Sequence, residues 1–147
     1  MKKVDFGSGI GRYRYLSVDG WRCILQSFSP SIEDFSFYSC DLNDKIAKVF
    51  SEVMDRDAAL KKVYFGRNKT LSAYGWRCIL HSLSPSIEYF SFKDCDLNDE
   101  KAKVFSEVMG RYIALKKLNF DSNDLLTTDG LKCILQRLSP YPEVSKE

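Results

Sequence analysis

The chain has 147 residues, of which 44% are apolar and 14% aromatic, so residues 1–147 can form a single domain with its own core. Lysine and arginine total 22 against 20 aspartate and glutamate, and this net charge of +2 excludes the basic excess expected of a nucleic-acid-binding surface. No apolar run approaches the roughly 20 residues that span a bilayer, and the start MKKVDFGSG lacks the apolar stretch of a secretory signal. We therefore expect a soluble, cytoplasmic protein with no nucleic-acid or membrane partner.

The elements predicted along the chain alternate between short strands and helices. After a strand near 3–6, the alternation of Phe35 and Phe37 predicts a strand at 33–37, and the helical spacing of Ala47 and Phe50 predicts a helix behind it. The scheme continues with strands near 61–65, 88–92 and 116–120, in steps of 28 or 27 residues (61 − 33 and 88 − 61). Strands joined in this way by helices predict a parallel sheet with right-handed crossovers.

A period of 55 residues underlies these elements. The segment from Trp21 to Lys62 recurs almost unchanged from Trp76 to Lys117, and a third copy begins at Leu131, since 76 − 21 and 131 − 76 both equal 55. A fixed period predicts units that stack on their neighbours, because no unit can bury its apolar face alone. Functional residues are therefore expected where the copies differ.

A glycine-rich insertion at 7–15 interrupts the first unit. Lys2 and Trp21 are 19 residues apart (21 − 2), whereas Lys61 and Trp76 are 15 apart (76 − 61), so four extra residues lie within GSGIGRYRY. Alternate glycines at 7, 9 and 11 resemble a phosphate-binding loop only weakly, and a loop folded over the first repeat is the preferred interpretation. The alternating Arg and Tyr residues that follow suit either a local contact or a contact with a partner.

The strand segments carry a family resemblance. LKKVYFGRN and LKKLNFDSN resemble the LxxLxLxxN core of leucine-rich repeats, and IEDFSFYSCDL and IEYFSFKDCDL resemble its Cys-bearing variant. Alternation of the two types, each followed by a full helix, is similar to the ribonuclease-inhibitor-like class. The resemblance implies a right-handed α/β leucine-rich-repeat solenoid of about five repeats, curved, with strands on the concave face and helices on the convex face. It also implies binding of a protein partner, with ribonuclease inhibition as the nearest family activity.

The Asn and Cys residues that follow the strands have a structural interpretation. Asn68, Asn123, Cys40 and Cys95 stand where a turn leaves buried backbone groups that a stacked side chain can bind. All five cysteines obey the period, their number is odd and no CxxC pair exists. We therefore expect free thiols in a reducing compartment instead of disulfides or a metal site.

The sequence contains no pattern of residues typical of an enzyme. The single histidine, His81, stands where other copies have Gln26 and Gln136, so an exposed helix position is preferred over catalysis or ligation. The acidic DLND segments at 41–44 and 96–99 lack the Gly and distal Glu of a calcium loop, so Asn43 and Asn98 are interpreted as helix caps. No nucleophile with a base is visible, and we predict a protein without catalysis, cofactor or metal.

Strand alternation assigns rows of side chains to the predicted concave face. One row, formed by Lys2, Glu33, Lys61, Glu88 and Lys116, predicts a ladder of alternating charge that fixes the register of the strands. The rows beyond it differ between the copies, and a central group of tyrosines amid mixed charge suits protein recognition, although an unselected surface is the alternative. The candidate protein-binding residues are Asp34, Tyr38, Tyr64, Tyr89, Lys93, Asn119 and Asp121.

The ends of the array predict a rival function. The period places Ser145 where Phe35 stands in the first copy, so no sixth strand is expected and the apolar pattern stops near Leu138. Open edge strands around Val4 and Phe120 would then pair with another copy of the chain. The alternative to a protein-binding scaffold is a structural module that forms end-to-end homo-oligomers, as expected of a fragment of a larger receptor or effector or of an engineered array.

Overall fold

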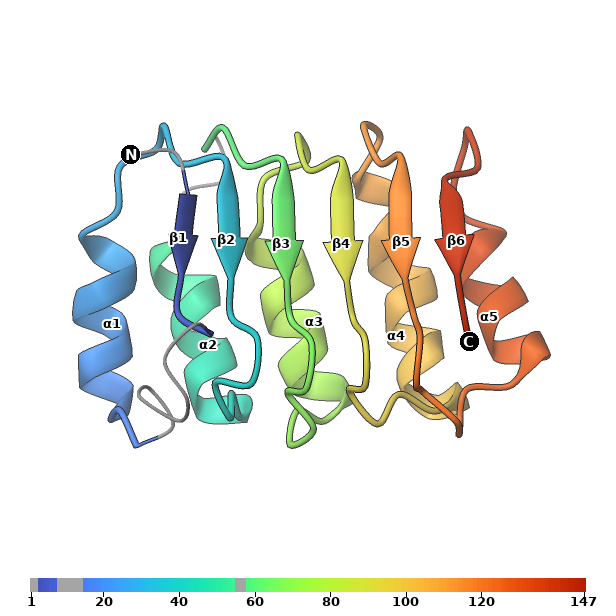
Figure 1. Cartoon of the computed structure of the whole chain (residues 1–147), viewed down its shortest axis with the longest axis horizontal. Helices are drawn as coiled ribbons and strands as arrows, with labels where there is room; N and C mark the ends of the chain where they lie inside the picture. The colour runs from blue at the N-terminus through green and yellow to red at the C-terminus, as the bar shows by residue number, and fades with distance from the viewer. Residues whose placement is uncertain (1–2, 8–14, 55–57) are drawn as a thin grey trace.

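The computed structural model describes residues 3–7, 15–54 and 58–147, in which strands and helices alternate along the chain (Figure 1). The strands are β1 (Lys3–Asp5), β2 (Asp34–Ser36), β3 (Lys62–Tyr64), β4 (Tyr89–Ser91), β5 (Lys117–Asn119) and β6 (Glu143–Ser145). The helices are α1 (Val18–Gln26), α2 (Asp44–Val53), α3 (Ala73–Ser82), α4 (Asp99–Val108), the short 3-10 helix η1 (Met109–Arg111) and α5 (Thr128–Leu135).

The strands form a single parallel sheet in chain order, and the helices lie side by side behind it (Figure 1). Each strand pairs with the next in register, so that Phe35 lies between Val4 and Val63, and Phe90 between Val63 and Leu118. The helices pack against their neighbours in the same order, from α1 to α5. The predicted α/β solenoid and its strand register are confirmed.

A column of phenylalanine rings forms the centre of the core. Phe6, Phe37, Phe65, Phe92 and Phe120 each follow a strand directly and are buried against the helices. Neighbouring rings along the column stack with centroids 5.5, 5.6, 6.0 and 5.6 Å apart. Because the three inner rings each stack on the repeat before and the repeat after, the repeats are stabilised by stacking and not by separate cores.

Two buried asparagines connect the turns that follow the strands. Asn68 accepts a hydrogen bond from the backbone N–H of Leu42 at 3.0 Å and donates to the carbonyls of Phe37 and Phe65 at 2.8 and 2.7 Å. Asn123 repeats this arrangement one unit later, with the amides of Cys95 and Leu97 and the carbonyls of Phe92 and Phe120 as partners. The structural interpretation of these positions is confirmed, and each side chain is here called an asparagine clamp.

The DLND segments cap helices, as predicted. Asn43 accepts from the backbone N–H of Ile46, and Asn98 accepts from that of Lys101. The second aspartate of each segment has a role that the sequence did not reveal, because Asp99 accepts from both the N–H and the hydroxyl of Thr127 at 2.9 and 2.6 Å. Each acidic segment therefore caps its own helix and fixes the start of the next one.

The sixth strand corrects one prediction. β6 pairs with β5 so that Val144, and not Ser145, lies beside the core position of Leu118. The link from Pro140 to β6 is one residue shorter than the 55-residue period requires, and a shift of one residue exchanges the two faces of a strand. The backbone N–H of Phe120 donates to Ser145 at 2.7 Å, so the prediction of an open edge at Phe120 is wrong.

Parts of two predictions, the charge ladder and the glycine-rich insertion, concern residues that the structure does not describe. Lys2 of the charge ladder and residues 8–14 of the glycine-rich insertion lie outside the described residues. No helix in the described ranges combines the length and apolar character that a membrane span needs.

Candidate functional site

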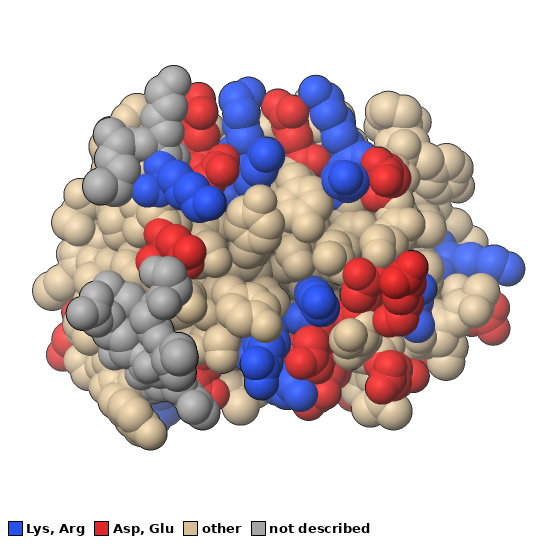
Figure 2. All heavy atoms as spheres, in the orientation of Figure 1, with Lys and Arg blue, Asp and Glu red and all other residues tan. Residues whose placement is uncertain are grey.

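The outward side chains of β1 to β6 form one face of the molecule, here called the strand face (Figure 2). Every candidate binding residue lies in one of these strands or shortly after its end. The register places Asp34, Lys62, Tyr89 and Lys117 in one row, with Ser36, Tyr64, Ser91 and Asn119 in the next. These rows agree with those predicted from strand alternation. Figure 2 shows charged side chains alternating along the upper rim, where the strands begin, above an uncharged strip across the middle.

The charge ladder at the amino ends of the strands is present around Glu88. One carboxylate oxygen lies 3.1 Å from the ammonium nitrogen of Lys61, and the other lies 3.0 Å from that of Lys116. Hydrogen bonds from Lys116 and Lys61, together with their charges, hold the pKa of Glu88 below its ordinary value of 4.5. The ladder thus joins β3, β4 and β5 and engages both oxygens of Glu88.

We predict that this ion pairing makes stability depend on pH. Because the folded-state pKa of Glu88 is lowered, the stabilisation is present above the ordinary value of 4.5 and is lost as the pH falls through the lower folded-state value. In urea denaturation at neutral pH, Glu88→Gln is expected to unfold at a lower midpoint than the natural chain. The difference should shrink as the pH falls below 4.5 and as salt is added. Glu100→Gln is the control, and a difference independent of pH would contradict the prediction.

Tyr64 and Tyr89 form the aromatic centre of the strand face. Their ring centroids are 5.3 Å apart with an interplanar angle of 50°, and both side chains are half-buried. Burial, followed by the nearby Tyr89 and Asp34, raises the pKa of Tyr64, so its hydroxyl remains a neutral donor. The pair lies in a hollow of about 410 Å³, whose lining residues are Lys62, Tyr64, Glu88, Tyr89, Lys116 and Lys117.

Tyr38 lies beyond this pair, at the carboxyl ends of the strands. It is 38% exposed, and a Cβ placed on Gly66 would come within 2.7 Å of its ring carbon Cδ2. The ring therefore lies directly over Gly66, where only a glycine leaves room for it. In the second unit the corresponding neighbours are Lys93 and Asp121, so the aromatic residue and the glycine are replaced together.

The remaining candidate residues differ in how far the fold itself uses them. Lys93 is exposed, but Asn119 accepts a hydrogen bond from the backbone N–H of Asp121 at 2.8 Å. Asp121 accepts from the hydroxyl of Ser145 and from the N–H of Glu147. The carboxylate of Asp121 thus anchors the end of β6 and Glu147 beyond it, and these partners reduce its availability to another protein.

Residues that bear on catalysis or metal binding lie apart from this face. His81 is exposed in the last turn of α3. All five cysteines lie in the described ranges and are free, and burial raises the pKa of Cys40 and Cys95 to about 12. The described residues contain no group of three His, Cys, Asp or Glu side chains arranged to hold a metal ion.

Comparison with known proteins shows the fold of the chain. No family model matches it, and no curated protein matches it. The C-terminal domain of tropomodulin from Caenorhabditis elegans has a TM-score of 0.67 at 16% identity, over 94% of this chain and 82% of that one. The leucine-rich-repeat-containing protein LegL7 from Legionella pneumophila has a TM-score of 0.61 at 15% identity, over 92% of this chain and 43% of that one. The chain is a leucine-rich-repeat solenoid.

A third similar structure belongs to a protein complex. A chain from the yeast complex of Rad7 and Elc1 has a TM-score of 0.64 at 15% identity, over 87% of this chain and 29% of that one. This leucine-rich-repeat solenoid thus spans less than half the length of the LegL7 and Rad7–Elc1 chains that it matches. The similarity at these identities concerns the fold, and the function must be argued from the strand face.

Sequence reasoning did not assign a binding role to several residues that line the hollow of this leucine-rich-repeat solenoid, although Glu88 and Lys116 were predicted in the charge ladder. Lys62 and Lys117 flank Tyr89 in the same row, and Lys116 and Glu88 close the amino-end rim. The signal that would have found Lys62 and Lys117 was present, because both occupy the row that already contained the candidates Asp34 and Tyr89. Lysine recurs at both positions in the two units, so a search for differences between the copies does not select them.

Proposed function

We infer that the chain is a non-enzymatic scaffold that binds a protein partner through its strand face. The observation that supports this function is the hollow of about 410 Å³ around the contacting rings of Tyr64 and Tyr89. Aromatic side chains held on a rigid sheet lose little conformational freedom on binding, and such residues dominate the energy of protein interfaces. Lysines and a glutamate surround the rings and supply the polar rim that interfaces require.

The cellular setting and the ribonuclease-inhibitor-like class belong to the same proposal. Five free cysteines, two of them buried thiols of raised pKa, support a reducing cytoplasmic setting. Alternating Asn clamps and Cys residues support the class. Inhibition of a ribonuclease is not proposed, because a strongly basic partner would meet Lys62, Lys116 and Lys117 on this face.

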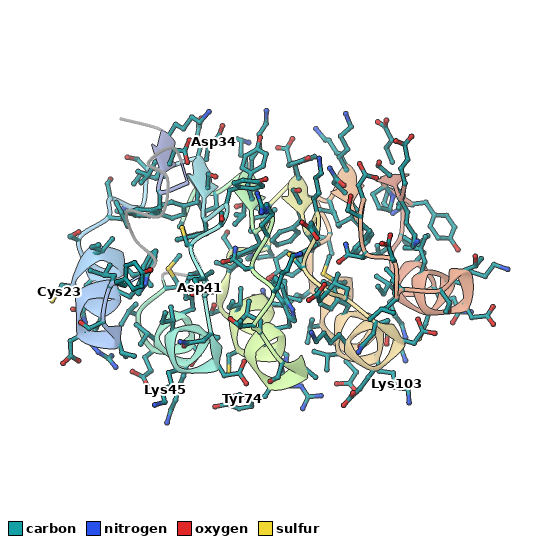
Figure 3. The ribbon with its side chains drawn as sticks, turned by 60° about the horizontal axis from the view of Figure 1, so that its bottom comes forward. Cys23, Asp34, Asp41, Lys45, Tyr74 and Lys103 are labelled. Carbon is teal, nitrogen blue, oxygen red and sulfur yellow. The ribbon has the colours of Figure 1, made fainter. Side chains whose placement is uncertain are left out.

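The test is capture of partners from a cell extract by the natural chain and by a variant with Tyr38, Tyr64 and Tyr89 all changed to Ala. We predict that the triple variant retains less than about a tenth of the captured partner, because truncating central aromatic anchors has the largest effects at interfaces. Tyr74→Ala is the matched control, because Tyr74 is 54% exposed on the helical side (Figure 3). Equal capture by the natural chain and the triple variant would contradict the proposed function.

A second function, end-to-end self-association, is supported by the last repeat. Leu131, Leu135 and Val144 are half-exposed, whereas the corresponding Trp76 and Leu80 are fully buried by the following repeat. A second copy stacked on this end would cover the three side chains and pair with the edge strand β6. Sedimentation that gives a monomer over a wide concentration range would exclude this function, and the triple tyrosine variant should leave any self-association unchanged.

A further inference from the structure

The lysines around the hollow are not equally neutralised. Glu88 uses both carboxylate oxygens on Lys61 and Lys116, as described above. Lys62 has no ion pair within the part of the chain that the structure describes, and Lys117 lies 3.9 Å from Glu143, at the outer limit of such a contact. Glu143 is itself 76% exposed, so water weakens this contact further. Two ammonium groups are therefore available to an anion.

These two ammonium groups stand on either side of an aromatic ring. Lys62 on β3, Tyr89 on β4 and Lys117 on β5 are direct neighbours in the sheet register. Adjacent parallel strands are about 4.8 Å apart, so the two lysine side chains leave the sheet about 10 Å apart, with the Tyr89 ring between them. Tyr64 contacts Tyr89 from the next row and extends the apolar surface.

A second hollow continues the first toward the end of the array. It has a volume of about 230 Å³ and shares Tyr89 and Lys117 with the first hollow. Its other lining residues are Leu118, Asn119, Glu143 and Ser145. Together the two hollows cross the strands from β3 to β6, which is a path along which an extended peptide segment can lie.

We propose that this part of the strand face binds an acidic peptide segment of the partner. A carboxylate of the segment lies between Lys62 and Lys117, and an adjacent apolar side chain packs on the Tyr64 and Tyr89 rings. The proposal rests on the function inferred above and specifies the chemistry of the partner. A basic segment is disfavoured beside Tyr89, because Lys62 and Lys117 flank it in the register and Asp34 lies on the far side of Lys62. A wholly apolar segment would leave the two lysines without a counter-charge.

The contact between Lys117 and Glu143 gives the proposal a distinctive consequence. A bound carboxylate would compete with Glu143 for Lys117, so removing the charge of Glu143 should strengthen binding. A role of Glu143 in fold stability alone would not produce this effect, because lost structure weakens binding. Glu143→Gln is therefore expected to tighten binding about two- to fivefold, whereas Lys62→Ala and Lys117→Ala each weaken it by a similar factor.

The experiment is an NMR titration of the isotope-labelled chain with short synthetic peptides that contain one glutamate and one phenylalanine separated by none, one or two alanines. We expect saturable shifts of the backbone amides of Lys62, Tyr64, Tyr89 and Lys117, which weaken as salt is added. Peptides with glutamine in place of glutamate test the charge, and peptides with lysine test its sign. Lys103→Ala, on the outer side of α4 (Figure 3), is the control variant and should bind as the natural chain does.

The outcomes separate this proposal from the broader function. Equal binding of the glutamate and glutamine peptides, or weaker binding by Glu143→Gln, would overturn the preference for an acidic segment. Absence of saturable shifts with every glutamate peptide at millimolar concentration would overturn it as well. In each case, loss of partner capture by the triple tyrosine variant would still support protein binding by the strand face. Unchanged capture would contradict both the acidic-segment proposal and protein binding by this face.

Discussion

Phe92→Ala is expected to lower the free energy of unfolding by about 3–5 kcal/mol, the range for removing a large ring from a close-packed core. Phe92 is fully buried, and its ring stacks on Phe65 and Phe120 at 6.0 and 5.6 Å. It also makes T-shaped contacts with Trp76 and Phe105, with ring centroids 5.4 and 4.9 Å apart. Because each repeat contacts only its neighbours, the missing ring also weakens the connection between the two halves of the array.

Urea denaturation followed by circular dichroism measures this effect. Phe28→Ala is the control, since Phe28 is half-buried and contacts only Phe6 and Phe35 among the rings of the described residues. We expect the midpoint of Phe92→Ala to fall well below that of Phe28→Ala, with an unfolding transition that broadens or separates into two steps. A midpoint equal to that of the natural chain would show that the stacked column does not stabilise the array.

Asn68→Ala is expected to cost about 3 kcal/mol or more, because several buried backbone groups lose their partner at once. The side chain is fully buried and binds the N–H of Leu42 and the carbonyls of Phe37, Phe65 and Gly66. Asn68→Asp retains the size of the side chain but directs a carboxylate oxygen at those carbonyls. It should destabilise the chain at least as strongly as Asn68→Ala, and less so at low pH, where the carboxyl becomes protonated.

The comparison for this prediction is Asn43→Ala, which removes an exposed helix cap. Asn43 accepts one hydrogen bond, from Ile46 at 3.0 Å, and its loss should cost about 1 kcal/mol. Thermal and urea unfolding of the three variants should therefore rank Asn43→Ala as the most stable. If Asn68→Ala unfolded at the same midpoint as Asn43→Ala, the buried clamp would contribute no more than a surface cap.

The sequence predicted the strand register well because the period constrains it strongly. Once Phe35 and Phe90 were assigned to the core, the 55-residue spacing fixed which side chains face outward on every strand up to Asn119. The same reliance on the period caused the error at β6, where one residue fewer before Val144 restores an apolar residue at the core position. Insertions and deletions are visible only when the copies can be aligned, and the last copy is too short for that.

The candidate site was predicted less completely than the fold. The rows correctly placed Tyr64 beside Tyr89, because direct and diagonal neighbours on one face of a sheet are in contact. They could not show that the Tyr38 ring lies over Gly66, since Tyr38 follows the strand in a turn where Ser39 has a positive φ of 55°. Nor could they show that Asp121 anchors the end of β6, because its partner Ser145 was assigned to the core face.

The asparagine clamps limit how such an array can change in length. Each clamp joins a Cys-type repeat to the Asn-type repeat that follows it: Asn68 binds the turns after β2 and β3, and Asn123 those after β4 and β5. Between β3 and β4 the Cys95 thiol forms the link instead, because it donates to the carbonyl of Phe65. Loss or gain of one repeat would therefore place two repeats of the same type side by side and interrupt this alternation. The smallest duplication or deletion that leaves every buried turn satisfied is a pair of repeats, and a pair is the length of the period seen in the sequence.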